Sequence, residues 1–245
     1  MRRAGGIVAE VLDILSKSVK PGMKTKELDN IAEREMKRLG AESSFKNYHG
    51  YPAVLCVSVN DEIVHGIPGD RVLKEGDIVS LDFGVIYQGY QGDSAVTVTV
   101  GEASSAAKRL IEATKGCLES GIAAARAGAK LGDISAAIQQ YADLKGYAVV
   151  REYTGHGIGR EMHEDPQIPN STEPPFGLKA GTGPVLKKGM TFALEPMLST
   201  GDWRTRVADD HWTVLTADGS MAAHFEHTVA INNHEAEVLT RGAYA

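Results

Sequence analysis

The stretch VLKEGDIVSLDFGV at residues 72–85 recurs as VLKKGMTFALEPML at residues 185–198. Aligning the two stretches without gaps places Asp82 on Glu195. Internal repeats indicate an architecture built from related structural units. The repeat therefore guides the interpretation of the rest of the chain.

Two further pairs of segments support the repeat. VHGIP, which contains His65, corresponds to GHGIG, which contains His156. PGMKTKELDNIA at residues 21–32 corresponds to AGAKLGDISAAI at residues 127–138. Because the three pairs occur in the same order, we predict two related halves that face each other, with the functional cleft between them.

Apolar residues recur at helical spacing in four stretches. These stretches are residues 7–15, 28–39, 106–125 and 134–144. Thr25 is the expected N-cap of the second helix and Gly40 its end, while Asp133 or one of its neighbours opens the fourth and Gly146 closes it. We therefore predict one pair of helices in each half.

Strand-like segments follow each helical pair. They are VLCVSVN, DIVSLDFGVIY and DSAVTVTV in the first half, and TFALEPML, WTVLTADG and HFEHTVAI in the second. Helices followed by strands, twice, indicate an α+β fold. Because the strands come in hairpins, we predict a central antiparallel sheet covered by helices. We expect one catalytic domain over residues 1–245, with halves of approximately 1–104 and 105–245.

The composition excludes several classes of function. The 245-residue chain has a formal net charge of −6 with acidic and basic residues interspersed, so we expect no nucleic-acid partner. No apolar run reaches the roughly 20 residues that span a bilayer, and we expect a cytoplasmic protein without a membrane partner. Cys56 and Cys117 form neither a disulfide framework nor a thiolate metal site. Any metal must therefore be bound by oxygen and nitrogen.

Asp82 and Asp93 flank an expected hairpin turn at residues 87–89. Directly opposed residues of such a hairpin have numbers whose sum is odd, and this pair meets that condition. Both carboxylates should then project from one face of the sheet, opposite or diagonal to each other. Two exposed polar residues beside a turn are the alternative interpretation. Like charges this close repel unless a proton or a cation lies between them.

Glu195 and Glu226 lie within the apolar segments TFALEPML and AAHFEHTVAI. Acidic residues are rarely buried without a partner, so an ion pair with Lys or Arg is one explanation. The strands that carry the four acids contain almost no basic residues, however. A pair of divalent cations such as Mn, Fe, Co or Zn would neutralise the carboxylates and could support hydrolysis.

The segment GHGIGREMHEDPQIPN begins at Gly155 and supplies the histidines His156 and His163. A glycine-rich phosphate loop would require a helix after it, and Pro166 and Pro169 follow instead. His156 is therefore a candidate metal ligand. His163 is either an ordinary surface histidine or, through its place in this motif, a catalytic one.

Together these motifs resemble the type I methionine aminopeptidases of the pita-bread superfamily. The resemblance covers nearly the whole chain. It rests on NYHGYP from Asn47, VSVNDEIVHGIPGDRVLKEGDIVSLDFGV from Val57, GYQGDSAVTV from Gly89, GHGIGREMHEDP from Gly155, FALEPML from Phe192 and DDHWTVLTADGSMAAHFEHTVAI from Asp209. It implies a pita-bread fold with two pseudo-symmetric halves and a curved central antiparallel sheet.

The resemblance also implies five metal ligands. It places them at Asp82, Asp93, His156, Glu195 and Glu226, holding two divalent ions drawn from Co, Mn, Fe, Zn and Ni. By the same resemblance Asp93 and Glu226 bridge the ions. His156 and Glu195 complete one ion, and Asp82 completes the other.

The implied reaction removes the N-terminal methionine of nascent polypeptides that have a small second residue. A water or hydroxide between the ions attacks the carbonyl carbon of the first residue. Glu195 acts as the proton shuttle, His163 bonds the substrate carbonyl, and His65 assists at the scissile amide nitrogen or orients the peptide.

The methionine pocket implied by position is apolar and aromatic, as suits a flexible thioether. It is formed by Tyr48, Tyr51, Cys56, His65 and Trp212, with Phe45 and Met162 at its edge, and His163 also binds the substrate. Phe45 stands where the family often has a smaller residue, and Met162 stands where an aromatic residue is frequent. Plain core packing is the alternative for the aromatic residues.

Other pita-bread metallopeptidases, namely X-Pro aminopeptidases and dipeptidases, are the nearest alternatives. Those relatives usually carry an additional N-terminal domain. A pita-bread protein that only binds partners would typically lose ligands or gain basic segments, and this chain does neither. We expect a monomer that works close to the ribosome.

Overall fold

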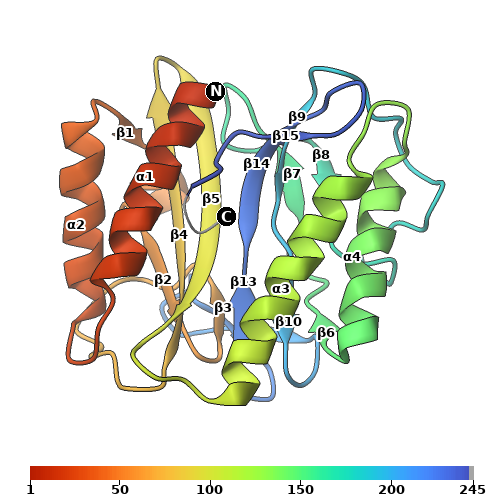
Figure 1. The fold of residues 1–245 in the computed structure, drawn as a ribbon. Coiled ribbons are helices and arrows are strands. Elements are labelled where there is room, and N and C mark those ends of the chain that lie inside the picture. The colour runs from red at the N-terminus through yellow and green to blue at the C-terminus, as the bar shows by residue number, and fades with distance from the viewer. Residues whose placement is uncertain (243–245) are drawn as a thin grey trace.

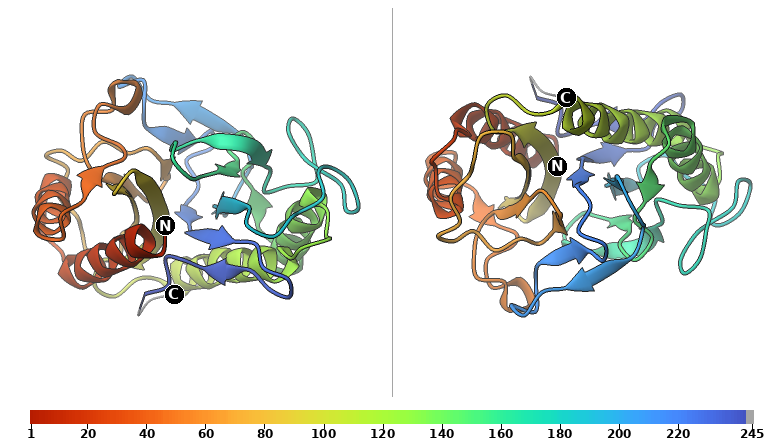
Figure 2. Two further views of the ribbon diagram at one scale, coloured as in Figure 1. Left: turned by 90° about the horizontal axis from the view of Figure 1, so that it is seen from above. Right: turned by 90° about the horizontal axis from the view of Figure 1, so that it is seen from below.

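Four α-helices lie along one face of a curved sheet in this computed structural model, which describes residues 1–242 (Figures 1 and 2). The helices are α1 (Arg2–Ser18), α2 (Thr25–Arg38), α3 (Ser105–Ala124) and α4 (Leu131–Lys145), with a short 3-10 turn, η1, at Tyr48–Gly50. The hairpin of strands β11 (Thr205–Val207) and β12 (Val214–Thr216) lies beyond the opposite face of the sheet (Figure 2). The predicted pairing of helices is confirmed.

Within residues 1–242, nine strands form the main sheet in the order β1-β4-β5-β14-β9-β7-β8, with β2 beside β4 and β15 beside β14. Their bounds are β1 Glu42–Ser43, β2 Cys56–Val59, β4 Ile78–Tyr87, β5 Tyr90–Thr99, β7 Gly155–Gly157, β8 Glu164–Ile168, β9 Thr191–Leu194, β14 Glu226–Ala230 and β15 Glu237–Val238. The pairings between these strands are antiparallel, as predicted.

Within the described residues, two smaller three-stranded sheets accompany the main sheet. One joins β3 (Glu62–Val64), β12 (Val214–Thr216) and β11 (Thr205–Val207), and therefore links the two halves of the chain. The other joins β6 (Ala148–Val149), β10 (Met197–Ser199) and β13 (Ala222–His224).

The centre of the main sheet is the boundary between the halves. β5 of the first half pairs with β14 of the second, and β4 and β9 flank this central pair. α1 packs on β4 and β5, while α3 packs on β14 and β9 (Figure 1). The arrangement is the predicted pita-bread fold, with helical pairs covering two pseudo-symmetric halves of one antiparallel sheet.

The same backbone contact occurs at matching positions of the two halves. Lys24 forms an isolated antiparallel bridge with Val72, and the corresponding residues Lys130 and Val185 form the same bridge in the second half. These four residues belong to the segments that the sequence comparison paired. The turn that follows each bridge leads into β4 in the first half and into β9 in the second.

The starts of two helices differ in detail from the prediction. α4 has Lys130 as its N-cap, and Asp133 is its third residue, whose carboxylate accepts from the Lys130 N–H at 2.8 Å. Thr25 is the first residue of α2 and Lys24 is the N-cap, so the predicted cap is wrong by one position. The Thr25 hydroxyl accepts a hydrogen bond from the Gly69 N–H at 2.8 Å, so it joins the helix to a neighbouring loop. Gly40 and Gly146 end their helices with φ of 70° and 76°, as expected of residues past a helix terminus.

Two segments that were predicted as single strands are each broken. TFALEPML divides into β9 and β10 at Glu195 and Pro196, and HFEHTVAI divides into β13 and β14 at Phe225. Proline has no N–H to donate to a strand ladder, which accounts for the first break. Glu195 therefore lies between two strands instead of inside one, and this frees its side chain to face the cleft.

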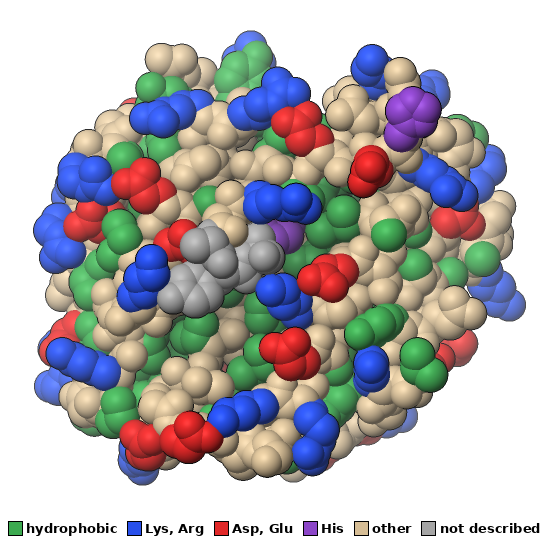
Figure 3. Space-filling view, in the orientation of Figure 1, with side chains coloured by type: hydrophobic (Ala, Val, Ile, Leu, Met, Phe, Trp, Pro, Cys, Tyr) green, Lys and Arg blue, Asp and Glu red, His purple; other side chains and the backbone are tan. Residues whose placement is uncertain are grey.

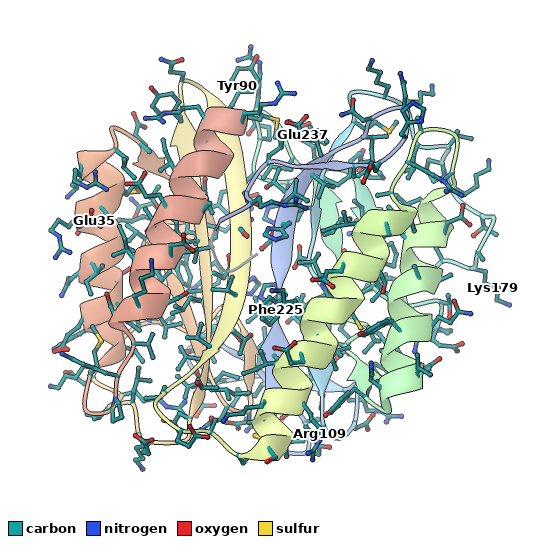
Figure 4. The ribbon with its side chains drawn as sticks, in the orientation of Figure 1. Glu35, Tyr90, Arg109, Lys179, Phe225 and Glu237 are labelled. Atoms are coloured by element: carbon teal, nitrogen blue, oxygen red, sulfur yellow. The ribbon has the colours of Figure 1, made fainter. Side chains whose placement is uncertain are left out.

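Phe225, at the second break, lies over the centre of the sheet beside α3 (Figure 4). Its side chain belongs to the large apolar cluster between the sheet and the helices. On the helical face of the molecule, acidic and basic side chains are interspersed (Figure 3). No helix among residues 1–242 combines the length and the apolarity needed to cross a membrane.

Candidate metal centre and substrate cavity

The β4–β5 hairpin positions the two aspartates. Asp82 is paired with Ala95, and Gly84 is paired with Asp93, across a two-residue turn at residues 88–89. The two carboxylates are therefore diagonal neighbours on one face, as their numbering predicts. Glycine at position 84 leaves space there, since an added Cβ would lie 3.1 Å from an Asp93 carboxylate oxygen.

The second half adds a glutamate beside this pair. Glu226 begins β14 and pairs with Ala95 of β5, so Asp82, Ala95 and Glu226 form one row across three strands. Asp93 is held by Thr228 of β14, whose hydroxyl accepts from the Asp93 N–H at 3.0 Å. Both halves thus direct carboxylates to the same side of the sheet.

His156 on β7 faces these acids. Its Nδ1 lies 2.9 Å from the carbonyl oxygen of Gly157, which can only accept, so Nδ1 carries the proton and Nε2 is free to bind a metal. Nε2 lies 3.6 Å from Glu195 Oε1 and 4.0 Å from Asp93 Oδ2. Asp93, His156 and Glu226 offer ligand atoms within 4.8 Å of one another.

The buried carboxylates of this cluster repel one another, and a bound cation would stabilise their charged forms. Burial, followed by mutual repulsion, raises the pKa values of Asp82, Glu195 and Glu226 well above the usual range. Burial raises the pKa of Asp93 to about 7. Burial likewise lowers the pKa of His156 to about 4, which keeps its ring neutral at physiological pH.

Several ligand atoms lack a protein partner. Among the described residues, Asp82 Oδ1, Asp93 Oδ1 and Glu226 Oε1 are buried and accept no hydrogen bond. Buried polar atoms in native proteins are almost always satisfied. Four carboxylates and one imidazole without sulfur are a donor set that fits divalent first-row metals.

A cavity of about 220 Å³ opens onto the cluster. The structure brings every sequence-predicted site residue to its wall. These residues are Phe45, Tyr48, Tyr51, Cys56, His65, Asp82, Asp93, His156, Met162, His163, Glu195, Trp212 and Glu226. The carboxylates and His156 make up its acidic end, and the apolar cluster that contains Phe45, Tyr51, Cys56 and Met162 makes up its apolar end.

The apolar end is a cluster of its own, separate from the main core. Tyr51 is fixed there because its hydroxyl donates toward the carbonyl oxygens of Leu55 at 3.1 Å and Gly66 at 2.9 Å. Its ring contacts the Trp212 ring edge-on, with the ring centroids 5.1 Å apart. These aromatic side chains pack against one another and also line the cavity, so plain core packing does not describe them fully.

The two auxiliary histidines occupy different places. His65 follows β3 with a φ of 61°, and burial lowers its pKa to about 4. Its ring centroid lies 5.9 Å from that of Tyr153. His65 does not belong to the group of Asp93, His156 and Glu226, whose ligand atoms lie close together. The His163 ring lies 4.2 Å from that of His156, and its Nδ1 is 2.8 Å from the Tyr48 hydroxyl.

Sequence reasoning missed three residues at this site. His49 and Val64 also line the cavity. His224 is fully buried behind it, with both ring nitrogens unpartnered among the described residues and Nε2 4.0 Å from Glu195 Oε2. The sequence signal for His224 was its position two residues before Glu226 in a segment predicted as one strand, where alternate residues share a face.

Comparison with known proteins identifies the family. The model of metallopeptidase family M24 matches residues 1–233. Methionine aminopeptidase 1 of Bacillus subtilis is 51% identical over 241 residues, covering 98% of this chain and 95% of that protein. Methionine aminopeptidase of Clostridium acetobutylicum is 50% identical, with 98% and 94% covered.

Solved structures agree with this relationship. Methionine aminopeptidase from Thermotoga maritima superimposes with a TM-score of 0.94 at 48% identity, covering 98% of this chain and 95% of that one. Prolidase from Pyrococcus furiosus shares the fold alone, with a TM-score of 0.78 at 22% identity, and only 62% of that chain is covered. The chain therefore belongs to metallopeptidase family M24 and, within it, to the methionine aminopeptidases.

Proposed function

We propose that this protein removes the N-terminal methionine from nascent polypeptides and peptides, with a preference for a small second residue. One observation carries the proposal. A single cavity joins an apolar, aromatic end to a cluster of buried carboxylates and His156. The apolar end suits the methionine side chain, and the acidic end suits the free amino group of the substrate.

Two divalent ions among Co, Mn, Fe, Zn and Ni would complete the acidic end. Asp93 and Glu226, whose ligand atoms lie within 4.8 Å of each other and of one in His156, would bridge them. His156 and Glu195 would complete one ion, and Asp82 would complete the other. When bound, such ions lower the pKa of an attacking water and polarise the scissile carbonyl.

The chain's own residues then handle the proton and the developing charge. Glu195 lines the cavity with Oε1 3.6 Å from His156 Nε2, where it is placed to take a proton and return it to the leaving amine. His163, at the cavity wall, would donate a hydrogen bond to the substrate carbonyl oxygen. His65 would assist at the amide nitrogen or orient the peptide.

Substrate selection follows from the apolar end. Phe45, Tyr51, Cys56 and Met162 are buried against one another and leave a space lined on one side by Trp212. A linear thioether can follow such an irregular space more readily than a branched side chain. We expect a Met-Ala-Ser peptide to be cleaved much faster than Leu-Ala-Ser.

The decisive experiment uses protein stripped of metal. Each candidate ion is restored anaerobically, and cleavage of Met-Ala-Ser, Leu-Ala-Ser and N-acetyl-Met-Ala-Ser is followed while calorimetry counts the ions bound. We expect two ions, cleavage of the first peptide, and little cleavage of the acetylated one. Equal cleavage of Met and Leu peptides would refute the pocket assignment, and full activity of the stripped protein would refute the metal assignment.

The X-Pro specificity of other pita-bread enzymes is tested in the same assay. An Ala-Pro-Ser peptide should remain intact under conditions that consume Met-Ala-Ser, and the reverse result would favour the alternative. We further propose that residues 1–245 act as one catalytic domain in a cytoplasmic monomer close to the ribosome. Sedimentation of the purified protein tests the monomer.

A further inference from the structure

A hydrogen bond crosses the mouth of the cavity between the two halves. The Tyr48 hydroxyl, in the first half, lies 2.8 Å from Nδ1 of His163 in the second. The two rings also lie against each other, with centroids 5.4 Å apart and planes inclined by 30°. The proposed methionine pocket does not explain this contact, because such a pocket requires only the apolar face of Tyr48.

The direction of this hydrogen bond has a chemical consequence. A neutral imidazole carries one proton, on either Nδ1 or Nε2. The Tyr48 hydroxyl lies 2.8 Å from Nδ1 and can donate a hydrogen bond to the lone pair that Nδ1 carries when the ring proton is on Nε2. This hydrogen bond favours the tautomer whose proton is on Nε2. Without the hydroxyl, the two tautomers of His163 would be free to exchange.

The backbone around Tyr48 holds the hydroxyl in place. Asn47 and His49 adopt φ values of 68° and 48°, a region in which residues other than glycine are strained. The Tyr48 N–H donates to the Phe45 carbonyl at 2.9 Å, and the Tyr51 N–H donates to the Tyr48 carbonyl at 3.0 Å. Strained backbone of this kind tends to persist where a side chain must point in one direction.

We propose that Tyr48 is a positioning residue that holds His163 in the tautomer with its proton on Nε2. The proposal rests on the role given to His163 in the proposed function, because only an N–H donor can stabilise charge that develops on the substrate carbonyl oxygen. A tautomer protonated on Nδ1 would present a lone pair to that oxygen and repel it. Tyr48 therefore acts on the reaction through His163.

Tyr48→Phe tests the proposal, since it removes the hydroxyl and keeps the ring that lines the cavity. We expect kcat on Met-Ala-Ser to fall about 10- to 100-fold, the usual effect of removing an orienting partner, while KM changes little. The double variant Tyr48→Phe/His163→Ala should be no slower than His163→Ala alone, because Tyr48 has nothing left to orient.

Tyr90→Phe is the matched control. The Tyr90 hydroxyl also bonds across the halves, accepting from Arg160 at 3.1 Å, but it lies at the tip of the β4–β5 hairpin away from the cavity (Figure 4). Its removal should leave kcat and KM unchanged. Thermal unfolding of each variant checks that the fold is kept.

A direct measurement of the tautomer uses ¹⁵N-labelled, zinc-loaded protein. Histidine ¹⁵N shifts should place the His163 proton on Nε2 in the natural protein and show a mixture of tautomers in Tyr48→Phe. An unchanged tautomer, or independent rate losses in the double variant, would overturn the proposal. Normal turnover of His163→Ala would instead refute the role of His163 itself, and would do so whatever the Tyr48 variant shows.

Discussion

Residues 72–76 and 185–189 make matching backbone contacts in the two halves of the molecule. Gly76 has a φ of 88° and donates to the Val100 carbonyl at 2.9 Å, while Gly189 has a φ of 90° and donates to the Ile231 carbonyl at 3.0 Å. Six residues farther along, the first half carries Asp82 inside a long strand. The second carries Glu195 at a break before proline.

The paired histidines diverge more than the paired acids. His156 lies in β7, where a backbone carbonyl fixes its tautomer and turns Nε2 toward the carboxylates. His65 lies after β3 and makes edge contacts with Tyr153 and Trp212. The repeated segments therefore carry matching histidines, but the surroundings of the two rings differ.

The largest effect is expected where the halves meet. Asp93→Asn removes a carboxylate that faces both Glu226 and His156, and so disturbs ligands from both halves. We expect metal occupancy to fall and kcat/KM on Met-Ala-Ser to drop by about three orders of magnitude, since metal ions supply several kcal/mol of transition-state stabilisation. Metal analysis and peptide assays measure both. An active, fully loaded variant would show that the site does not depend on this junction.

The next prediction compares the paired histidines directly. His156→Ala should weaken metal binding by at least about 10- to 100-fold and lower turnover with it. His65→Ala should leave metal affinity unchanged and slow turnover by about 100-fold, as for the loss of a general acid or a charge-stabilising donor. Calorimetric titration with Mn measures the loss of metal affinity in each variant, and steady-state kinetics measure the loss of turnover. Equal losses of affinity would mean that the halves have not diverged at this position.

Much of this comparison could be predicted from the sequence. The parity of Asp82 and Asp93 identified their shared face, because strand geometry alternates with period two. Helix ends at Gly40 and Gly146 followed from the positive φ that glycine tolerates. These features depend on local geometry that the chain encodes over a few residues.

Other features depend on contacts between distant segments. The break at Glu195 was missed because the apolar run around it looks continuous, although Pro196 was a signal. His49 reaches the cavity through a left-handed turn that spacing does not predict. The hydrogen bond between Tyr48 and His163 joins positions 115 residues apart, and no periodicity connects them.

A smaller effect is expected from pH in the metal-free protein. The folded-state pKa of Asp93 is raised to about 7, so its contribution to stability is present at low pH and is lost as pH rises through that value. The raised pKa values of Asp82, Glu195 and Glu226 act in the same direction. Buried histidines with lowered pKa values oppose this trend only below about pH 6.5.

Between pH 6.5 and pH 8 the unfolding midpoint of the stripped protein should therefore fall. Each tenfold shift in proton affinity is worth about 1.4 kcal/mol, or about 3–6 °C for a chain of this size. The unfolding midpoint of the metal-loaded protein should fall less, because the ions hold the carboxylates in their charged form. Calorimetric scans at several pH values measure the difference in midpoint between the loaded and the stripped protein. A difference that narrows with rising pH would contradict the assignment of these acids as ligands.

The smallest effect tests whether the repeated backbone is equivalent in the two halves. Gly76→Ala and Gly189→Ala each force alanine into the left-handed region at a site where an added Cβ meets nothing closer than 3.7 Å. Each should lower the free energy of unfolding by about 1–2 kcal/mol, and by the same amount within about 0.5 kcal/mol. Gly6→Ala in α1 is the control: its Cβ would also meet open space, and we expect a gain of about 0.5–1 kcal/mol because the glycine there is helical. Denaturant titration measures all three. Unequal losses at Gly76 and Gly189 would mean that the halves differ in their backbone energetics as well as in their side chains.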